Sequence, residues 1–113
     1  MRFINWMLIA LLCAAVFLVG CGSKEKDLNV FAACLTEKGV KMYGASWCPH
    51  CQQQKDMFGT AFSHVDYIEC GNGNAECTAA GIKNLPTWKF ADGTSVVGTQ
   101  QLNTLAKKSG CEI

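Results

Sequence analysis

The spacing of apolar residues changes several times along the chain, and each change predicts a different element. The first regular pattern has helical spacing and lies between residues 28 and 35. Asp27 or Asn29 could cap this helix, and Gly39 ends it. The residues that follow, 40–45, are mostly apolar and predict a buried strand, the first of the chain.

The rest of the chain alternates between helical and strand-like stretches, which are separated by turns rich in Gly, Asn and Asp. Helices are expected at residues 48–62, 75–80 and 101–108, and strands at residues 65–70, 87–90 and 95–98. Asp92-Gly93, between the last two strands, is a hairpin signal. The order α-β-α-β-α-β-β-α predicts one α/β domain with a central mixed sheet of about four strands flanked by helices.

The N-terminal segment has a different pattern. Arg2 is followed by an uncharged apolar run, and the run closes with Leu18-Val19-Gly20-Cys21, which resembles a bacterial lipobox. We therefore expect residues 1–20 to be a lipoprotein signal peptide and Cys21 to be lipidated. Residues 21–27 would then be a tether, and residues 28–113 the folded domain. An uncleaved membrane anchor and simple secretion are the alternatives. All three place the domain outside the cytoplasm, on the periplasmic face or cell surface.

Charge and cysteine content narrow the function further. Residues 1–20 hold one Arg and no acidic residue, so the remainder has nine basic and nine acidic residues. Without a basic patch, nucleic acid is not expected as a partner. Eight cysteines are many for 113 residues. Outside the cytoplasm such a density indicates disulfides.

The sequence Trp47-Cys48-Pro49-His50-Cys51 carries the strongest chemical signal. Zinc sites and haem attachment sites use the same cysteine spacing, but here a strand precedes the pair and a helix follows it. Cys48 would therefore lie at a helix N-terminus, where free N–H groups stabilise a thiolate. Pro49 suits the first helical turn. His50, when protonated, would be a second positive partner, although it could also be only an exposed spacer.

Together with Leu85-Pro86-Thr87 before a later strand, this motif resembles the thioredoxin superfamily. A longer string is more specific and resembles the thioredoxin-like domain fused to vitamin K epoxide reductase homologues of bacteria and plants. The resemblance runs from about Asn29 to the C-terminus, but this chain carries no multi-helix membrane domain. The string comprises Met42-Tyr43-Gly44-Ala45, the cysteine motif, Gln54-Lys55, Phe58-Gly59, Tyr67-Ile68-Glu69-Cys70, Ala80-Gly81-Ile82, Pro86-Thr87-Trp88, Leu105-Ala106 and Ser109-Gly110.

The resemblance implies a thioredoxin-like fold and a protein-disulfide oxidoreductase that needs no metal or other cofactor. Cys48 would be the nucleophile and Cys51 its shielded partner. Leu85-Pro86 would be a cis peptide bond, in a loop that faces the dithiol and binds substrate together with Thr87. We expect Trp47 to cover the active site and to contact substrate, and Trp88 to pack in or near the core.

Two features bear on the direction of the reaction. The Pro-His pair between the cysteines resembles the pattern of strongly oxidising family members. Met42 stands where thioredoxins carry a buried acid. Both favour disulfide formation in exported, cysteine-containing proteins, with a quinone-linked membrane protein of the vitamin K epoxide reductase type as electron acceptor. A membrane-tethered reductase or isomerase is one alternative. A non-catalytic metal or haem chaperone that uses Cys48, His50 and Cys51 is the other.

Six cysteines remain once Cys13, in the signal, and Cys21 are set aside, and six allow fifteen pairings. With Cys48–Cys51 as the redox pair, two further disulfides are expected. Cys70 ends a strand and Cys77 lies in the next helix, so we pair them, although a redox relay is also open. Cys34 and Cys111, which we place in the first and last helices, form the other pair. Zinc is less favoured, because His64 is isolated.

Overall fold

Four short strands form one mixed sheet in the order β2-β1-β3-β4 in the computed structural model, which describes residues 23–113. β1 (Lys41–Gly44) pairs in parallel with β2 (Asp66–Glu69). β3 (Thr87–Lys89) is antiparallel to β1 and to β4 (Ser95–Val97). The prediction of an α/β class, with a central mixed sheet of about four strands flanked by helices, is confirmed.

The helices occur in the predicted order, with two corrections at their ends. They are α2 (Ser23–Glu37), α3 (Pro49–Phe58), the 3-10 helix η2 (Gly59–His64), α4 (Ala75–Ala79) and α5 (Leu102–Ser109). Because α2 already begins at Ser23, the prediction that Asp27 or Asn29 caps it was wrong. The single helix predicted to reach Phe62 stops at Phe58, because Gly59 adopts a φ of 57° that ends the α-helical pattern.

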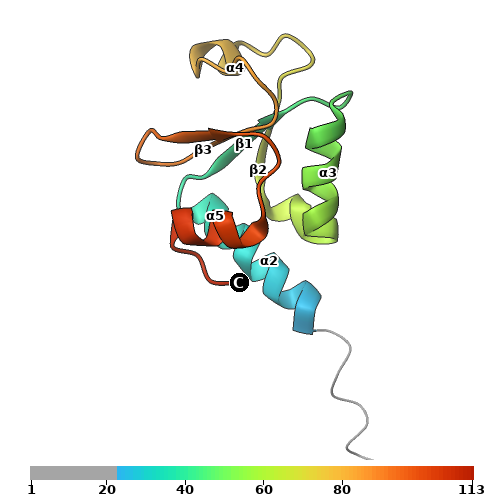
Figure 1. Ribbon diagram of the computed structural model, residues 1–113, viewed down its shortest axis with the longest axis vertical. Helices are drawn as coiled ribbons and strands as arrows, with labels where there is room; N and C mark the ends of the chain where they lie inside the picture. Colours follow the sequence, from blue (N-terminus) through green and yellow to red (C-terminus); the bar gives the residue numbers. More distant parts are fainter. Residues whose placement is uncertain (1–22) are drawn as a thin grey trace, which may run out of the picture.

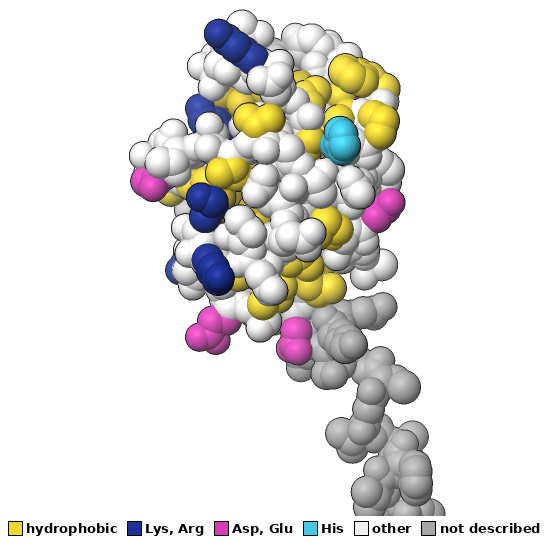
Figure 2. Space-filling view, viewed as in Figure 1, with side chains coloured by type: hydrophobic (Ala, Val, Ile, Leu, Met, Phe, Trp, Pro, Cys, Tyr) yellow, Lys and Arg dark blue, Asp and Glu magenta, His cyan; other side chains and the backbone are white. Residues whose placement is uncertain are grey.

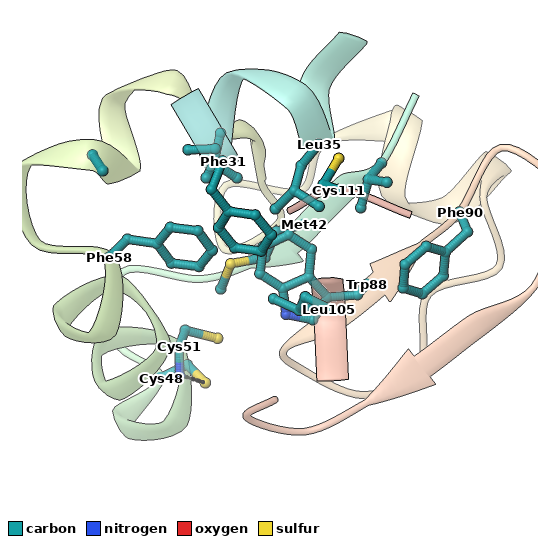
Figure 3. Close-up of a cluster of buried hydrophobic side chains, with 14 of the residues drawn as sticks. Phe31, Leu35, Met42, Cys48, Cys51, Phe58, Trp88, Phe90, Leu105 and Cys111 are labelled. Carbon is teal, nitrogen blue, oxygen red and sulfur yellow. Dashed lines mark hydrogen bonds between the residues drawn. The ribbon is translucent and has the colours of Figure 1, made fainter. Parts of the chain in front are cut away.

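The helices cover the two faces of the sheet unequally (Figure 1). Helices α2, α3 and α5 pack on one face, and the five-residue α4 lies on the other. Residues of β1 and β3 alternate between these faces, so that Met42 and Trp88 point into the larger cluster while Tyr43 points into the smaller one. The larger cluster is shown in Figure 3 and includes Phe31, Leu35, Met42, Phe58, Trp88, Phe90 and Leu105.

Aromatic packing fixes the position of α3 in this larger cluster. The ring of Phe58 lies 6.0 Å from that of Phe31 on α2 and 6.0 Å from that of Trp88 on β3, measured between centroids. Trp88 and Met42 are fully buried, and the expected core position of Trp88 is confirmed. The helix that begins at the cysteine motif is therefore held against both the sheet and α2.

Two disulfides join elements that are distant along the chain or across a loop. One links Cys34 on α2 to Cys111, and the other links Cys70 at the end of β2 to Cys77 on α4. Their Cα atoms are 6.0 and 5.8 Å apart, within the range that a disulfide spans. The structure therefore contains both pairs that the sequence suggests.

The predicted signal peptide, with Cys13, and the predicted lipidation site Cys21 lie outside the described residues. The predicted tether extends into the described part, where residues from Ser23 onward are helical. Within residues 23–113, no helix combines the length and the apolar character needed to cross a membrane.

Candidate dithiol site

Cys48 is the N-cap of α3, and its backbone is extended, with φ −87° and ψ 116°. Its sulfur accepts a hydrogen bond from the backbone N–H of Cys51, at 3.2 Å. Pro49 occupies the first helical turn, where its missing N–H leaves no partner unsatisfied. A thiolate at Cys48 would receive this N–H and the positive end of the helix dipole, which is the environment that favours a reactive cysteine.

The two thiols differ in their access to solvent. Both are free in the structure; Cys51 is fully buried, whereas 6% of Cys48 is exposed. Burial, followed by the hydrogen bond with Cys48, raises the pKa of Cys51 to about 11. Cys51 therefore keeps its proton at neutral pH, and Cys48 is the thiol that a partner can reach.

Trp47 and His50, on either side of Cys48, are both exposed. Trp47 is 70% exposed, and its indole lies over the loop after β2: a Cβ added to Gly71 would come within 2.9 Å of the indole nitrogen. Trp47 therefore flanks the dithiol, and its contact with substrate remains a prediction. The His50 carbonyl accepts a hydrogen bond from the Thr99 hydroxyl at 3.1 Å. Hydrophobic side chains gather around a histidine at the upper right of Figure 2, on the side where α3 lies in Figure 1.

The loop before β3 contains the cis peptide bond Leu85-Pro86. Pro86 is buried, and its carbonyl accepts a hydrogen bond from the Gly98 N–H at 2.8 Å. Leu85 is half-buried and packs against the cluster that contains both thiols. The Thr87 side chain is also buried, and its hydroxyl donates to the Asn84 carbonyl at 2.6 Å. Because this hydroxyl is already engaged, we expect any substrate contact of Thr87 to involve its backbone.

Gln54 is a buried polar residue whose role the sequence analysis missed. Its side-chain oxygen accepts hydrogen bonds from the Trp88 indole at 3.0 Å and from the Gln100 N–H at 2.7 Å. Its amide nitrogen donates to the Gln100 carbonyl at 3.0 Å. Gln54 thus ties the active-site helix both to β3 and to the loop before α5. Its place one turn after Cys51 on a buried stripe was the available signal, but Gln52 and Gln53 beside it obscured that signal.

A second polar group lies between α3 and β2 and was also missed as a functional feature. The Tyr67 hydroxyl donates to Glu69 at 2.8 Å, and the Ser46 N–H donates to the other carboxylate oxygen at 2.6 Å. The Lys55 ammonium stands 4.1 Å from the centroid of the Tyr67 ring. The two-residue spacing of Tyr67 and Glu69 on a strand was the only sequence signal that they share a face.

The remaining described cysteines and His64 are not arranged as the ligands of a metal site. Cys70 and Cys77 are bonded to each other, and His64 is exposed at the end of η2. Among residues 23–113, no three His, Cys, Asp or Glu side chains come together as a metal site would require. The expectation that the chemistry needs no metal stays a prediction.

Comparison with known proteins adds a fold and a chemistry to this geometry. No protein-family model matches the chain. A solved mutant thioredoxin from Halobacterium salinarum NRC-1 superposes with a TM-score of 0.53 and 27% sequence identity, over 66% of this chain and 74% of that one. This chain has a thioredoxin-like fold. The structure contains the two features that the sequence resemblance to thioredoxins implies, namely the dithiol at the start of α3 and the cis-proline loop.

The thioredoxin-like chain is also similar to the thiol-disulfide oxidoreductase LTO1 of Arabidopsis thaliana, with 38% identity over 85 residues. The match covers 67% of this chain and 22% of that relative, so the chain spans about a fifth of the relative's length. Both comparisons support placement in the thioredoxin-like superfamily. They support oxidoreductase chemistry at a cysteine pair, and the free Cys48–Cys51 pair provides the geometry for it.

Proposed function

We propose that this protein is an extracytoplasmic thiol:disulfide oxidoreductase that supports disulfide formation in exported proteins. The observation that carries the proposal is the asymmetry of the dithiol. The Cys48 sulfur caps a helix and accepts the Cys51 N–H, whereas Cys51 is fully buried with a raised pKa. One thiol is thus suited to exchange with a partner, and the other to closing or opening the internal disulfide.

The proposed cycle starts from the Cys48–Cys51 disulfide. A substrate thiolate attacks the Cys48 sulfur, the internal disulfide breaks, and Cys51 leaves as a thiolate that takes up a proton. The second thiolate of the substrate then attacks its own sulfur in the mixed disulfide, and Cys48 leaves as a thiolate. The substrate loses two electrons, and the protein retains them as the reduced dithiol.

Stabilisation of the reduced form decides the direction of such a cycle. A Cys48 thiolate that accepts a helix-terminal N–H would favour the reduced state and make the disulfide a stronger oxidant. Met42, fully buried in the core, supplies no acidic group of the kind that thioredoxins have at this place. We therefore place the protein on the oxidising side. A quinone-linked membrane protein of the vitamin K epoxide reductase type would take the two electrons from the dithiol.

A measurement of the reduction potential tests the direction. The purified protein is equilibrated with glutathione buffers, and the fraction of Cys48–Cys51 disulfide is followed by thiol labelling. We expect a potential well above the roughly −270 mV of thioredoxin, toward the roughly −120 mV of the strongest oxidants. Reduced, unfolded ribonuclease should be oxidised by the disulfide form. A potential at or below that of thioredoxin would indicate the reductase alternative instead.

Anchoring through Cys21 is the second part of the proposal. The charged stretch after Cys21 and the predicted lipobox support it. In the Cys21→Ser variant, loss of the lipid chains should remove stable membrane attachment, since each buried CH₂ contributes about 0.8 kcal/mol. Fractionation of cells would show the variant in the soluble or misprocessed fraction, with normal exchange activity after purification. A variant that stays membrane-bound and retains Arg2 would identify an uncleaved anchor.

A further inference from the structure

Cys51 must lose its proton each time it closes the internal disulfide, yet it is fully buried. Met42, which lies in the same buried cluster as Cys51, cannot accept a proton. With the pKa of Cys51 raised to about 11, direct loss of the proton to water would be rare at neutral pH. An acceptor elsewhere around the thiol would remove this barrier.

Gly44, at the end of β1, brings Cys51 close to Tyr67. A Cβ added at Gly44 would lie 3.1 Å from the Cys51 sulfur, 2.9 Å from a Tyr67 ring carbon and 3.3 Å from the Tyr67 hydroxyl oxygen. The thiol and the phenol therefore border the same small space above β1. Any larger residue at position 44 would separate them or displace one of them.

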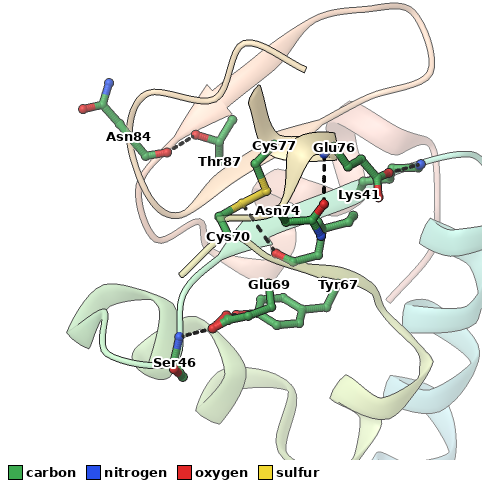
Figure 4. The surroundings of a disulfide bond; sticks show 11 residues. Lys41, Ser46, Tyr67, Glu69, Cys70, Asn74, Glu76, Cys77, Asn84 and Thr87 are labelled. Atoms are coloured by element: carbon green, nitrogen blue, oxygen red, sulfur yellow. Dashed lines mark hydrogen bonds and ion pairs between the residues drawn. A yellow bond between two sulfur atoms is a disulfide. The ribbon is translucent and has the colours of Figure 1, made fainter. Parts of the chain in front are cut away.

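From this space, the Tyr67 hydroxyl group reaches the carboxylate of Glu69 (Figure 4). It donates to one oxygen of Glu69 at 2.8 Å, while the Ser46 N–H holds the other oxygen at 2.6 Å. Glu69 is only half-buried, so a proton that reaches it can pass to solvent. The Cys51 thiol and the Tyr67 hydroxyl thus border one space beside Gly44, and the hydrogen bond from Tyr67 to Glu69 leads from that space toward the surface.

Charges around the path come from two elements, α3 and β2. Lys55 on α3 lies over the Tyr67 ring at 4.1 Å, Cys48 and Cys51 lie at the start of α3, and Glu69 follows Tyr67 on β2. Burial, followed by the hydrogen bond to Glu69, raises the pKa of Tyr67. Burial acts against ionisation of Glu69, but hydrogen bonds from Tyr67 and Ser46 outweigh it and lower the pKa of that carboxyl. Tyr67 is thus a neutral hydroxyl, and Glu69 a carboxylate.

We propose that Tyr67 and Glu69 form a proton relay that deprotonates Cys51 when the internal disulfide closes, an inference that rests on the proposed function. Cys48 is by then in a mixed disulfide with a disulfide-bearing partner. The Cys51 proton passes to the Tyr67 oxygen as the Tyr67 proton passes to Glu69. The Cys51 thiolate attacks the Cys48 sulfur, and the partner sulfur leaves as a thiolate. The protein loses two electrons, the partner disulfide gains them, and Glu69 releases its proton to solvent.

Dithiobis(nitrobenzoic acid) separates the two attacks in one stopped-flow experiment. The reduced full-length protein releases one nitrothiobenzoate when Cys48 attacks and a second when Cys51 displaces it. In Tyr67→Phe and Glu69→Gln, we expect the first phase to change less than about twofold. The second should slow by at least about tenfold at neutral pH, since positioned acid–base groups typically contribute about 10²–10⁴-fold. The double variant should be no slower than the worse single variant, because both act in one path.

The pH profile distinguishes a relay from a structural effect. The variants should approach the wild-type second phase as pH rises toward the pKa of Cys51, because hydroxide then removes the proton directly. Tyr43→Phe, on the opposite face of the sheet, and Glu76→Gln, a surface carboxylate paired with Lys41, are matched controls that should leave both phases unchanged.

Three outcomes would overturn an element of the scheme. An unchanged second phase in both relay variants, or equal slowing of both phases at every pH, would refute the relay. Should Tyr67→Phe fold poorly, Glu69→Gln still tests the path, since its amide oxygen can accept from Ser46. If the wild-type protein released no second nitrothiobenzoate at all, the proposed dithiol function itself would be wrong.

Discussion

The parallel strands β1 and β2 end at the same edge of the sheet, and each is followed by cysteines and a helix, yet the two units differ. After β1, Cys48 caps α3 and Cys51 follows one turn later, both as free thiols. After β2, Cys70 is bonded to Cys77 on α4. In that second unit the cap is Asn74, whose side-chain oxygen accepts the Glu76 N–H at 2.9 Å.

The difference shows how position in a strand–loop–helix unit decides what a cysteine pair can do. A thiol at the cap receives backbone N–H groups and can exist as a thiolate, which exchange requires. A cysteine within the helix, joined to the end of a strand, instead closes the loop between them. The short α4 packs on a small cluster around Tyr43 and Ile68. Because so small a core contributes little stability, the disulfide provides additional stability to this unit.

The largest contrast between the units should appear in activity. Cys48→Ser should abolish thiol–disulfide exchange, because no other accessible free thiol lies at the site. The double variant Cys70→Ser/Cys77→Ser should retain most of it. Turnover with a dithiol peptide, read by mass spectrometry, measures both. A double variant that is folded but inactive would identify Cys70–Cys77 as the redox relay.

The two structural disulfides should affect stability by different amounts. The Cys70–Cys77 disulfide has a sequence separation of 7, and its removal should lower the free energy of unfolding by about 2.5 kcal/mol in the chain-entropy treatment. Removal of Cys34–Cys111, with a separation of 77, should cost more, about 4.5 kcal/mol. Urea unfolding of the two double serine variants tests this ranking, and a smaller loss for Cys34–Cys111 would contradict it.

The N-cap of α4 should contribute a smaller amount to the free energy of unfolding. Asn74→Ala should destabilise the protein by about 1 kcal/mol, because it leaves the Glu76 N–H without its partner, whereas Asn74→Ser should cost little. Neither change should alter the exchange rate. Thermal unfolding with an activity assay on the same samples checks both expectations, and equal stability of the Ala and Ser variants would count against the cap.

The last expected effect is a pH dependence of stability that belongs to the β1–α3 unit and appears only above about pH 9. Folding raises the pKa of Cys51 from its ordinary 9.0 to about 11, so the folded state holds this proton more tightly than the unfolded state. The resulting stability is fully present below about pH 9 and is lost as pH rises toward 11. Unfolding of the reduced protein should show this loss, and Cys51→Ala should lack it. Parallel pH profiles of the two proteins would argue against the raised pKa.

Element order could be predicted from the sequence because helical and strand spacings differ, and because turns are marked by Gly, Asn and Asp. The ends of the helices were harder to predict from the sequence. Ser23 starts a helix within a charged stretch that has no apolar stripe to announce it. The break at Gly59 depends on a backbone angle that a glycine permits but does not dictate.

The cysteine motif could be recognised from the sequence because its residues are adjacent. The residues that support the motif are far apart in the sequence, so they could not be recognised in the same way. Gln54 meets Gln100 across 46 positions, and only the packed structure shows which of three consecutive glutamines turns inward. The Ser46–Glu69 contact spans 23 positions. The Ser46–Glu69 contact follows from the register of β1 on β2, which no local pattern encodes.

Helix α2 has a consequence for where the dithiol can work. It begins at Ser23 at the lower end of the molecule in Figure 1, while α3 begins at the upper end. Its 15 residues span about 22 Å at the rise of an α-helix. In the proposed lipid-anchored form, the reactive sulfur would therefore lie at the end of the domain opposite to the attachment point. A membrane-embedded electron acceptor could meet that sulfur only if the domain tips over or if the acceptor extends a loop upward, whereas exported substrates would meet it directly.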